Sequence, residues 1–220
     1  MDEFELEETD KLSQFSAASP HWTGAPSITL AHQLNEQCVG LVCELAATSL
    51  SPELPPFIMR NRDLWRLIEI DARKRVADFP FVIVDLRFKD VESWQRAGEG
   101  QLMGLPDSSH YNAVPPKLFE DLLLETLLFA RQAAREDTSV AKAMFGMTSL
   151  VASLIASLTL PQVRAIAMGN SQHLRVRWDN DPYFWGDLLV ACRSADERVL
   201  AAVRRQGKLL FCGEIVSLGQ

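Results

Sequence analysis

The stretch LTLPQVRAIAMGN at 158–170, followed by HLRVRWD at 173–179, decides how the second half of the chain is expected to fold. Thr159 stands where a helix needs an N-cap, and Pro161 is tolerated in the first turn that follows. Gly169 and Asn170 suit the C-terminal end of that helix, where left-handed backbone is common. HLRVRWD alternates between outward and inward side chains, as a half-buried strand does. The pattern predicts a helix, a turn and a short strand.

The segments around this stretch are predicted to be mainly helical. Residues 117–135 carry a wide apolar face, and a turn at 136–138 separates them from helical stretches around 140–145 and 150–157. A last helix is expected near 196–206, with Gly207 as its stop. KLLFCGEIVSL at 208–218 is expected to form one more strand.

The first half shows a similar order of elements. A helix is expected over 28–47, after which three prolines between residues 52 and 56 break it. A second helix is expected over 61–77, and FVIVDLRF at 81–88 is typical of a strand. A short helix is expected at VESWQRA, 91–97.

The two halves are related by an offset of 90 residues, which superposes 64–94 on 154–184 without gaps. Few identities persist, but an arginine followed by an aromatic residue recurs at Arg87 and Arg177. Each arginine is expected to stack or pair to fix its strand, ahead of any contact with DNA. The pattern indicates a duplication, whose two copies bury apolar faces against each other in one chain. The predicted organisation is an acidic flexible arm (1–26), a diverged first repeat (27–97), a linker (98–116) and a second repeat with a C-terminal helix and strand (117–220).

The second half resembles FlhD, a subunit of the flagellar master transcriptional regulator of bacteria. The resemblance rests on LTLPQ, then Ile166, Ala167 and Asn170 at the family's spacing, then Arg-Trp-Asp at 177–179. Upstream, Ala-Met-Phe at 143–145 is similar to the family's sequence after its first helix. The resemblance to FlhD covers about residues 117–206, and the first half of the chain resembles the family only through the internal repeat.

The resemblance implies a fold, a partner and a process. It implies a mainly helical fold with one short strand per repeat, in which two FlhD-like units form an intramolecular pseudo-dimer. FlhD-like proteins bind a zinc-containing FlhC subunit, which supplies most of the DNA affinity, and activate promoters with it. The implied function is therefore a transcriptional regulator subunit that reaches DNA through a complex with an FlhC-like protein, as part of a higher hetero-oligomer. No cofactor is expected on this chain, and any zinc would lie on the partner.

Two positions depart from the family pattern. Gly146 follows Phe145 where the family commonly has arginine. Some members carry a cysteine in the strand that cross-links the homodimer, whereas this chain has Leu174 and Val84 there. Two copies fused in one chain would not need such a cross-link.

Charge and composition agree with a regulator that needs a partner. The chain has 220 residues, a net charge of −7 and 47% hydrophobic residues, which is typical of a globular protein. An acidic chain is not expected to bind the phosphate backbone alone. Residues 1–11 contain six acids and one lysine, and they are either an interaction tail or a solubilising leader.

The expected location is the reducing cytoplasm. Four cysteines without a CxxC motif signal neither a zinc framework nor a redox pair, and the acidic start does not resemble a signal peptide. Residues 143–163 lack charge over about the length of a membrane span. Serine and threonine interrupt the run, so a buried core helix is favoured and no membrane contact is expected.

No catalytic chemistry is signalled. The four histidines are scattered, and no phosphate-binding loop, dinucleotide fingerprint or nucleophile elbow occurs. The chain is therefore expected not to be an enzyme. The alternative to a transcriptional regulator is a scaffold or adaptor of a flagellar or secretion system that does not bind DNA.

Two groups of residues are candidates for contacts. Basic clusters and the FlhD-like block give the DNA-binding candidates Arg73, Lys74, Arg75, Asn170, Arg204 and Arg205. For the first cluster, a solvated helix face with intrahelical pairs is the simpler interpretation. Apolar positions of the repeats give the candidates for the repeat or partner interface, namely Val84, Leu86, Phe88, Phe145, Leu160, Ile166, Leu174, Val176 and Trp178.

Overall fold

A computed structural model describes residues 26–49, 54–104, 116–194 and 196–216. The acidic segment and residues 105–115 of the predicted linker lie outside this range. The first unit comprises α2 (Pro26–Thr48), α3 (Pro56–Arg60), α4 (Arg62–Arg66), α5 (Ile70–Ala77), β1 (Val84–Asp85) and α6 (Val91–Gly98). The second comprises α7 (Pro116–Glu136), α8 (Thr138–Phe145), α9 (Ser149–Ser157), α10 (Leu160–Gly169), the 3-10 turn η2 (Ser171–His173), β2 (Arg175–Val176), α11 (Pro182–Arg193) and α12 (Glu197–Val216). The predicted mainly helical class is confirmed.

The second unit begins its helices as the local sequence dictates. Asp137 and Thr148 cap α8 and α9 by accepting hydrogen bonds from backbone amides. Thr159 and Gln162 form a capping box at the start of α10, with proline in the first turn. The predicted left-handed end of α10 is wrong, because Asn170 has φ of −131°. The left-handed cap is Gly146 instead, with φ of 61° at the end of α8.

The first unit is more broken than predicted. The single helix expected over 61–77 is two helices, α4 and α5, preceded by α3. The break falls at Ile68, whose side chain is buried while Glu69 adopts an extended backbone. Arg73 donates from Nε to the Ile68 carbonyl oxygen, 3.3 Å away, which helps to satisfy a backbone group freed by the break.

Two short strands join the units at the centre of the molecule. Val84 lies opposite Val176 and Asp85 opposite Arg175 in an antiparallel pair. The strands predicted over 81–88 and within 173–179 shrink to two residues each, because the chain turns away at positive φ soon after each strand. Asn35 of α2 positions the approach to β1, since its carboxamide bonds the carbonyl oxygens of Ala77 and Phe81 and the amide of Ile83.

The turn after each strand is built in the same way, 91 residues apart. Arg87 and Trp178 both have positive φ, of 50° and 56°. Three residues later, Asp90 and Asp181 cap α6 and α11 by accepting from backbone amides. The N-caps of α5 and α10, at 69 and 159, keep the predicted offset of 90, so the second unit gains one residue between helix and strand. The gapless offset of 90 through to 94 and 184 is therefore wrong from the strands onward, where the offset is 91.

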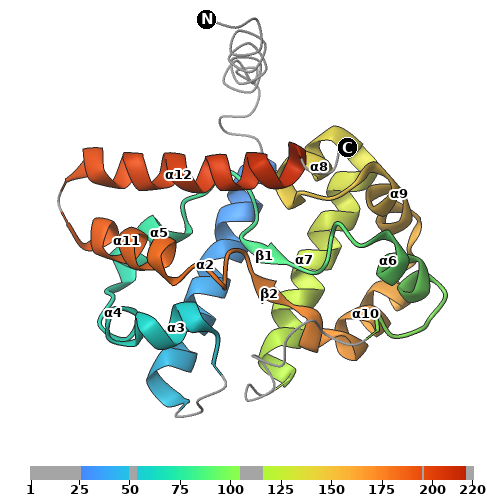
Figure 1. The fold of residues 1–220 in the computed structure, drawn as a ribbon. Coiled ribbons are helices and arrows are strands. Elements are labelled where there is room, and N and C mark those ends of the chain that lie inside the picture. The colour runs from blue at the N-terminus through green and yellow to red at the C-terminus, as the bar shows by residue number, and fades with distance from the viewer. Residues whose placement is uncertain (1–25, 50–53, 105–115, 195, 217–220) are drawn as a thin grey trace, which may run out of the picture.

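Each unit sends one helix onto the other. The central helices α2 and α7 pack against each other and against the short helices of their own units. Helix α6 of the first unit packs on α9 of the second, and α11 of the second packs on α3, α4 and α5 of the first (Figure 1). The core is therefore shared between the two halves of the sequence.

Helix α12 runs across the molecule above β1 and the start of α2 (Figure 1). It extends through the predicted stop at Gly207 and through the segment expected to form a strand at 208–218, as far as Val216. Both predictions are wrong for one reason. Gly207 lies where α12 crosses two rings, and a Cβ there would stand 2.8 Å from Phe79 Cε1 and 3.0 Å from Phe184 Cζ. The lack of a side chain at Gly207 therefore lets α12 approach these two rings closely, and it does not mark the end of the helix.

Among the described helices, none is long and apolar enough to cross a membrane by itself. By length and composition, α8 and α9 could do so only as a pair that is bent by 111°. Their inward side chains, including Met144, Phe145, Val151 and Ile155, are fully buried in the core.

Candidate partner and nucleic-acid interface

Two of the six predicted DNA-binding residues, Arg75 and Arg204, meet where α5 contacts α12. Arg73, Lys74 and Arg75 belong to α5, and Arg204 reaches α5 from α12. Arg205 follows on α12, but its side chain is exposed. Asn170 lies elsewhere, at the end of α10, and is 2% exposed.

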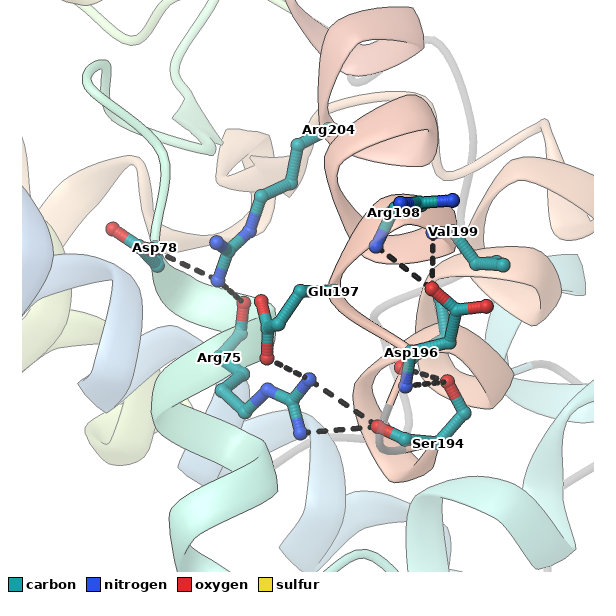
Figure 2. A network of polar contacts seen from close by, with 9 residues as sticks. Arg75, Asp78, Ser194, Asp196, Glu197, Arg198, Val199 and Arg204 are labelled. Carbon is teal, nitrogen blue, oxygen red and sulfur yellow. Dashed lines mark hydrogen bonds and ion pairs between the residues drawn. The ribbon is translucent and has the colours of Figure 1, made fainter.

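The α5–α12 contact is a network of charged hydrogen bonds (Figure 2). Arg75 donates to the Ser194 carbonyl oxygen at 3.3 Å and to Glu197 Oε1 at 2.8 Å. Arg204 donates from Nη2 to the Arg75 carbonyl oxygen and pairs with Asp78 Oδ2, each at 2.8 Å. A cation at the C-terminal end of α5 also suits the helix dipole. These two arginines therefore hold α12 on the first unit.

The cations that remain on the surface lie on the other side of α12. The α12 outer face consists of exposed residues only, and we define it as Arg198, Val199, Ala202, Arg205, Lys208 and Leu209. The two carboxylates described in this helix, Glu197 and Glu214, pair with arginines of the body instead. Within the described residues, none of the three cations of this face is in a salt bridge with a carboxylate. Lys74 is also exposed, close to the Arg75 end of the network.

Asn170 has a structural use in this fold. Its Oδ1 accepts from the Met103 amide at 2.9 Å, and its Nδ2 donates to the Ile166 carbonyl oxygen at 3.1 Å. The side chain thereby fastens the chain after α6 to the end of α10. Because its carboxamide is buried and bonded, we do not keep it among the candidates for DNA contact.

Five of the nine predicted interface residues contact the other unit, namely Val84, Phe88, Phe145, Val176 and Trp178. Leu86, Phe88, Phe145, Ile166 and Leu174 are buried. Phe88 meets Phe145 of the second unit edge-on at 5.5 Å between ring centroids. Trp178 meets Phe79 and Phe81 of the first unit at 6.4 and 6.0 Å. Leu160 differs, since it is 58% exposed at the first position of α10.

Arg177 is the central polar residue of the junction, as its predicted structural role requires. Its side chain is 2% exposed. The guanidinium donates to the carbonyl oxygens of Val82 and Phe145, and it lies over the Phe211 ring at 4.9 Å. Nη1 also donates to Glu214 Oε2 at 2.8 Å. One side chain thus joins the first unit, the end of α8 and α12.

Glu214 and Phe211 are two residues of this junction that the sequence patterns do not identify, because their segment has the pattern of a strand. Glu214 accepts from Arg177 and from Trp178 Nε1, and Lys89 lies 3.3 Å away. Phe211 stacks on Phe81 with 4.1 Å between ring centroids. The signal was present, because Leu200, Gly207, Phe211 and Glu214 share one side of a continuous helix at 3.6 residues per turn.

The described part of the chain offers little chemistry of other kinds. No group of three or more His, Cys, Asp or Glu residues could hold a metal ion there. An open cavity of about 360 Å³ beside the strands is lined by charges of both signs, including Arg87, Lys89, Asp85 and Asp90. Burial raises the pKa of Cys38 to about 12, with the neighbouring Cys43 adding to the effect, so this thiol is held protonated.

The fold and this interface define a helical two-unit protein whose last helix, α12, carries three exposed cations on one face. Residues 117–208 match the model of a family described as the flagellar transcriptional activator FlhD, and the first half has no family match. The match runs from α7 into α12 and includes Arg205 and Lys208. It confirms the resemblance and supports a role in transcription regulation; the family is not one of enzymes. No curated protein and no solved structure matches the chain.

Proposed function

We propose that this chain is a subunit of a heteromeric transcription regulator and contacts promoter DNA together with an FlhC-like protein. The observation that carries the proposal is the FlhD match over 117–208. The outer face of α12 lies largely within that match and presents Arg198, Arg205 and Lys208 with no carboxylate between them. Three cations are few for autonomous binding, which favours a DNA contact made as part of a complex.

We also propose that the two units stand in for an FlhD-like dimer. The exchange of α6 and α11, the pairing of β1 with β2 and the repeated turns 91 residues apart support this interpretation. A twofold arrangement within one chain would leave the outward faces of both units for partners. Ile70 and Leu160 occupy the first positions of α5 and α10 and are 70% and 58% exposed, so they are candidates for equivalent partner contacts.

The first experiment is co-purification with an FlhC-like protein, preferably one encoded next to this chain. The full chain and the partner are expected to form a complex that shifts promoter DNA in a gel, with an affinity that falls as salt rises. Failure to form any complex contradicts the proposal. A complex that forms without salt-dependent DNA affinity would instead favour the scaffold or adaptor alternative.

Variants of α12 locate the DNA contact. The double variant Arg205→Gln, Lys208→Gln is expected to weaken DNA binding on all sequences and to reduce the salt slope by about 2. A matched control removes one exposed arginine and one exposed lysine elsewhere, as Arg164→Gln on α10 and Lys117→Gln on α7. Equal losses in both double variants would show that net charge, not this face, determines the affinity.

A further inference from the structure

We propose that residues 2–10 of the chain dock onto the outer face of α12 in the absence of DNA. The chain would then carry its own competitor for this face. The docking itself can be tested on the isolated chain, whereas its consequence for DNA binding rests on the function proposed above.

The α12 outer face is suited to an acidic peptide that also carries apolar side chains. Its cations Arg198, Arg205 and Lys208 lie among Val199 and Leu209, which are 47% and 54% exposed. The two carboxylates described in this helix pair with arginines of the body, and Asp196, just before the helix, accepts from the backbone amides of Arg198 and Val199. A complementary occupant has carboxylates interspersed with single apolar side chains.

The N-terminal segment has this composition. DEFELEETD at 2–10 holds six carboxylates, with Phe4 and Leu6 set between them. Residues 1–25 contain six of the 29 acids and one of the 22 Lys and Arg residues, so they carry −5 of the net −7. The rest of the chain therefore carries only −2, and its charge is far less one-sided than the total suggests.

The structure places the start of α2 beside α12. His32 in the second turn of α2 lies 3.4 Å from Asp78, and the same carboxylate pairs with Arg204 of α12 at 2.8 Å. Pro26 precedes His32 by six residues, or about 9 Å of helix. The dark blue start of α2 lies below α12 in Figure 1. Helix α2 therefore begins close to α12, on the side of α12 that packs on the body, and the proposed docking face lies on the opposite side of the same helix.

The connection is long enough and uncharged. Residues 12–25 contain no Asp, Glu, Lys or Arg and span up to about 45 Å when extended, against about 30 Å for the whole of α12. A connection of this length gives an effective concentration in the millimolar range, so weak charge contacts suffice. Their strength depends on ionic strength, because the Debye length falls from about 10 Å at 0.1 M to 3 Å at 1 M salt.

Zero-length carbodiimide cross-linking of the full chain tests the docking without DNA or partner. Lys208 is the single lysine of α12, and Lys117 is an exposed lysine at the start of α7, the end of that helix farther from α12 (Figure 1). We expect peptides from 1–11 to be joined to Lys208 in the monomer at low salt, and this product to disappear at high salt. Cross-links to Lys117 in the same yield as to Lys208, or no cross-link to Lys208, would overturn the proposal.

A double-mutant cycle tests the consequence. The fourfold variant Glu3→Gln, Glu5→Gln, Glu7→Gln, Glu8→Gln is expected to raise the affinity of the complex for promoter DNA by about three- to tenfold at low salt. The gain should vanish when Arg198, Arg205 and Lys208 are also changed to glutamine. The same gain in both backgrounds would mean that the segment acts through net charge alone and would overturn competition at this face. Cross-links to Lys208 without any effect of the α12 variants on DNA would leave the docking standing and remove the proposed DNA contact.

Discussion

Arg177 is buried beneath α12 with its guanidinium Nη1 2.8 Å from Glu214 Oε2, and this pair fastens the last helix to the junction of the two units. Removing the carboxylate leaves a buried cation that keeps its two carbonyl partners and a more distant Asp85, 3.8 Å away. Glu214→Ala is therefore expected to lower the free energy of unfolding by about 2–4 kcal/mol. Urea denaturation followed by circular dichroism measures it.

The matched control is the other paired glutamate of α12. Glu197 pairs with Arg75 at 2.8 Å, but its own side chain is 75% exposed. Glu197→Ala should cost less than about 1 kcal/mol, since water and salt screen exposed pairs. Similar losses of unfolding free energy in the two variants would show that the Arg177–Glu214 pair stabilises the fold no more than an exposed ion pair does.

The part of the fold that could be predicted from sequence depends on neighbours along the chain. Thr159 and Gln162 cap α10 across three residues, and the apolar face of α7 repeats within a few turns. Such features need no knowledge of distant contacts, which is why the FlhD-like block could be placed in helix, turn and strand. The shortening of the strands could not be foreseen in the same way, because pairing depends on a partner about 90 residues away.

The errors have a common physical origin. Gly207 has the local signature of a helix stop, yet its lack of a side chain serves contact with Phe79 and Phe184, far away in sequence. Arg75 and Arg204 look like free cations in sequence, but they bind Glu197, Asp78 and backbone carbonyls across the α5–α12 contact. Which cations remain available for a partner is therefore a property of the tertiary structure.

Substitution by alanine is expected to have opposite effects on the stability of the protein at two glycines of α12. Gly207→Ala would place Cβ 2.8 Å from a ring carbon of Phe79, and the rings cannot both retreat, so we expect a loss of about 1–3 kcal/mol. Gly213→Ala meets nothing within 4 Å and should stabilise the helix by about 0.5–1 kcal/mol. Thermal unfolding of the two variants beside the unmodified chain checks the signs. A stabilised Gly207→Ala would show that α12 does not cross these rings in solution.

The exchanged helices predict how the second unit behaves alone. A fragment comprising 117–220 lacks α3, α4 and α5, so the buried face of α11, including Trp185, Leu188 and Leu189, loses its packing. We expect this fragment to dimerise by placing α11 on a second copy, whereas the full chain should be a monomer of 24.6 kDa in the absence of its partner. Light scattering after size-exclusion chromatography gives both masses. A fragment that folds as a stable monomer would contradict the proposed pseudo-dimer.

The cysteine thiols should react at different rates because they are buried to different extents. Burial raises the pKa of Cys38 to about 12 and that of Cys192 to about 11, and the pKa of the partly buried Cys212 is also raised. Since only the thiolate reacts, a pKa of 12 leaves about one Cys38 thiol in 10,000 ionised at pH 8. Iodoacetamide at that pH should therefore label Cys212 first, and Cys38 and Cys192 only on unfolding. Each unit by which the pH is increased should raise the labelling rate of native Cys212 about tenfold, as long as the pH stays below the raised pKa of this thiol. Mass spectrometry of peptides after timed quenching resolves the sites, with urea-unfolded chain as the control in which all four thiols react alike. Rapid labelling of Cys38 in the native chain would show that α2 does not hold this thiol in the core.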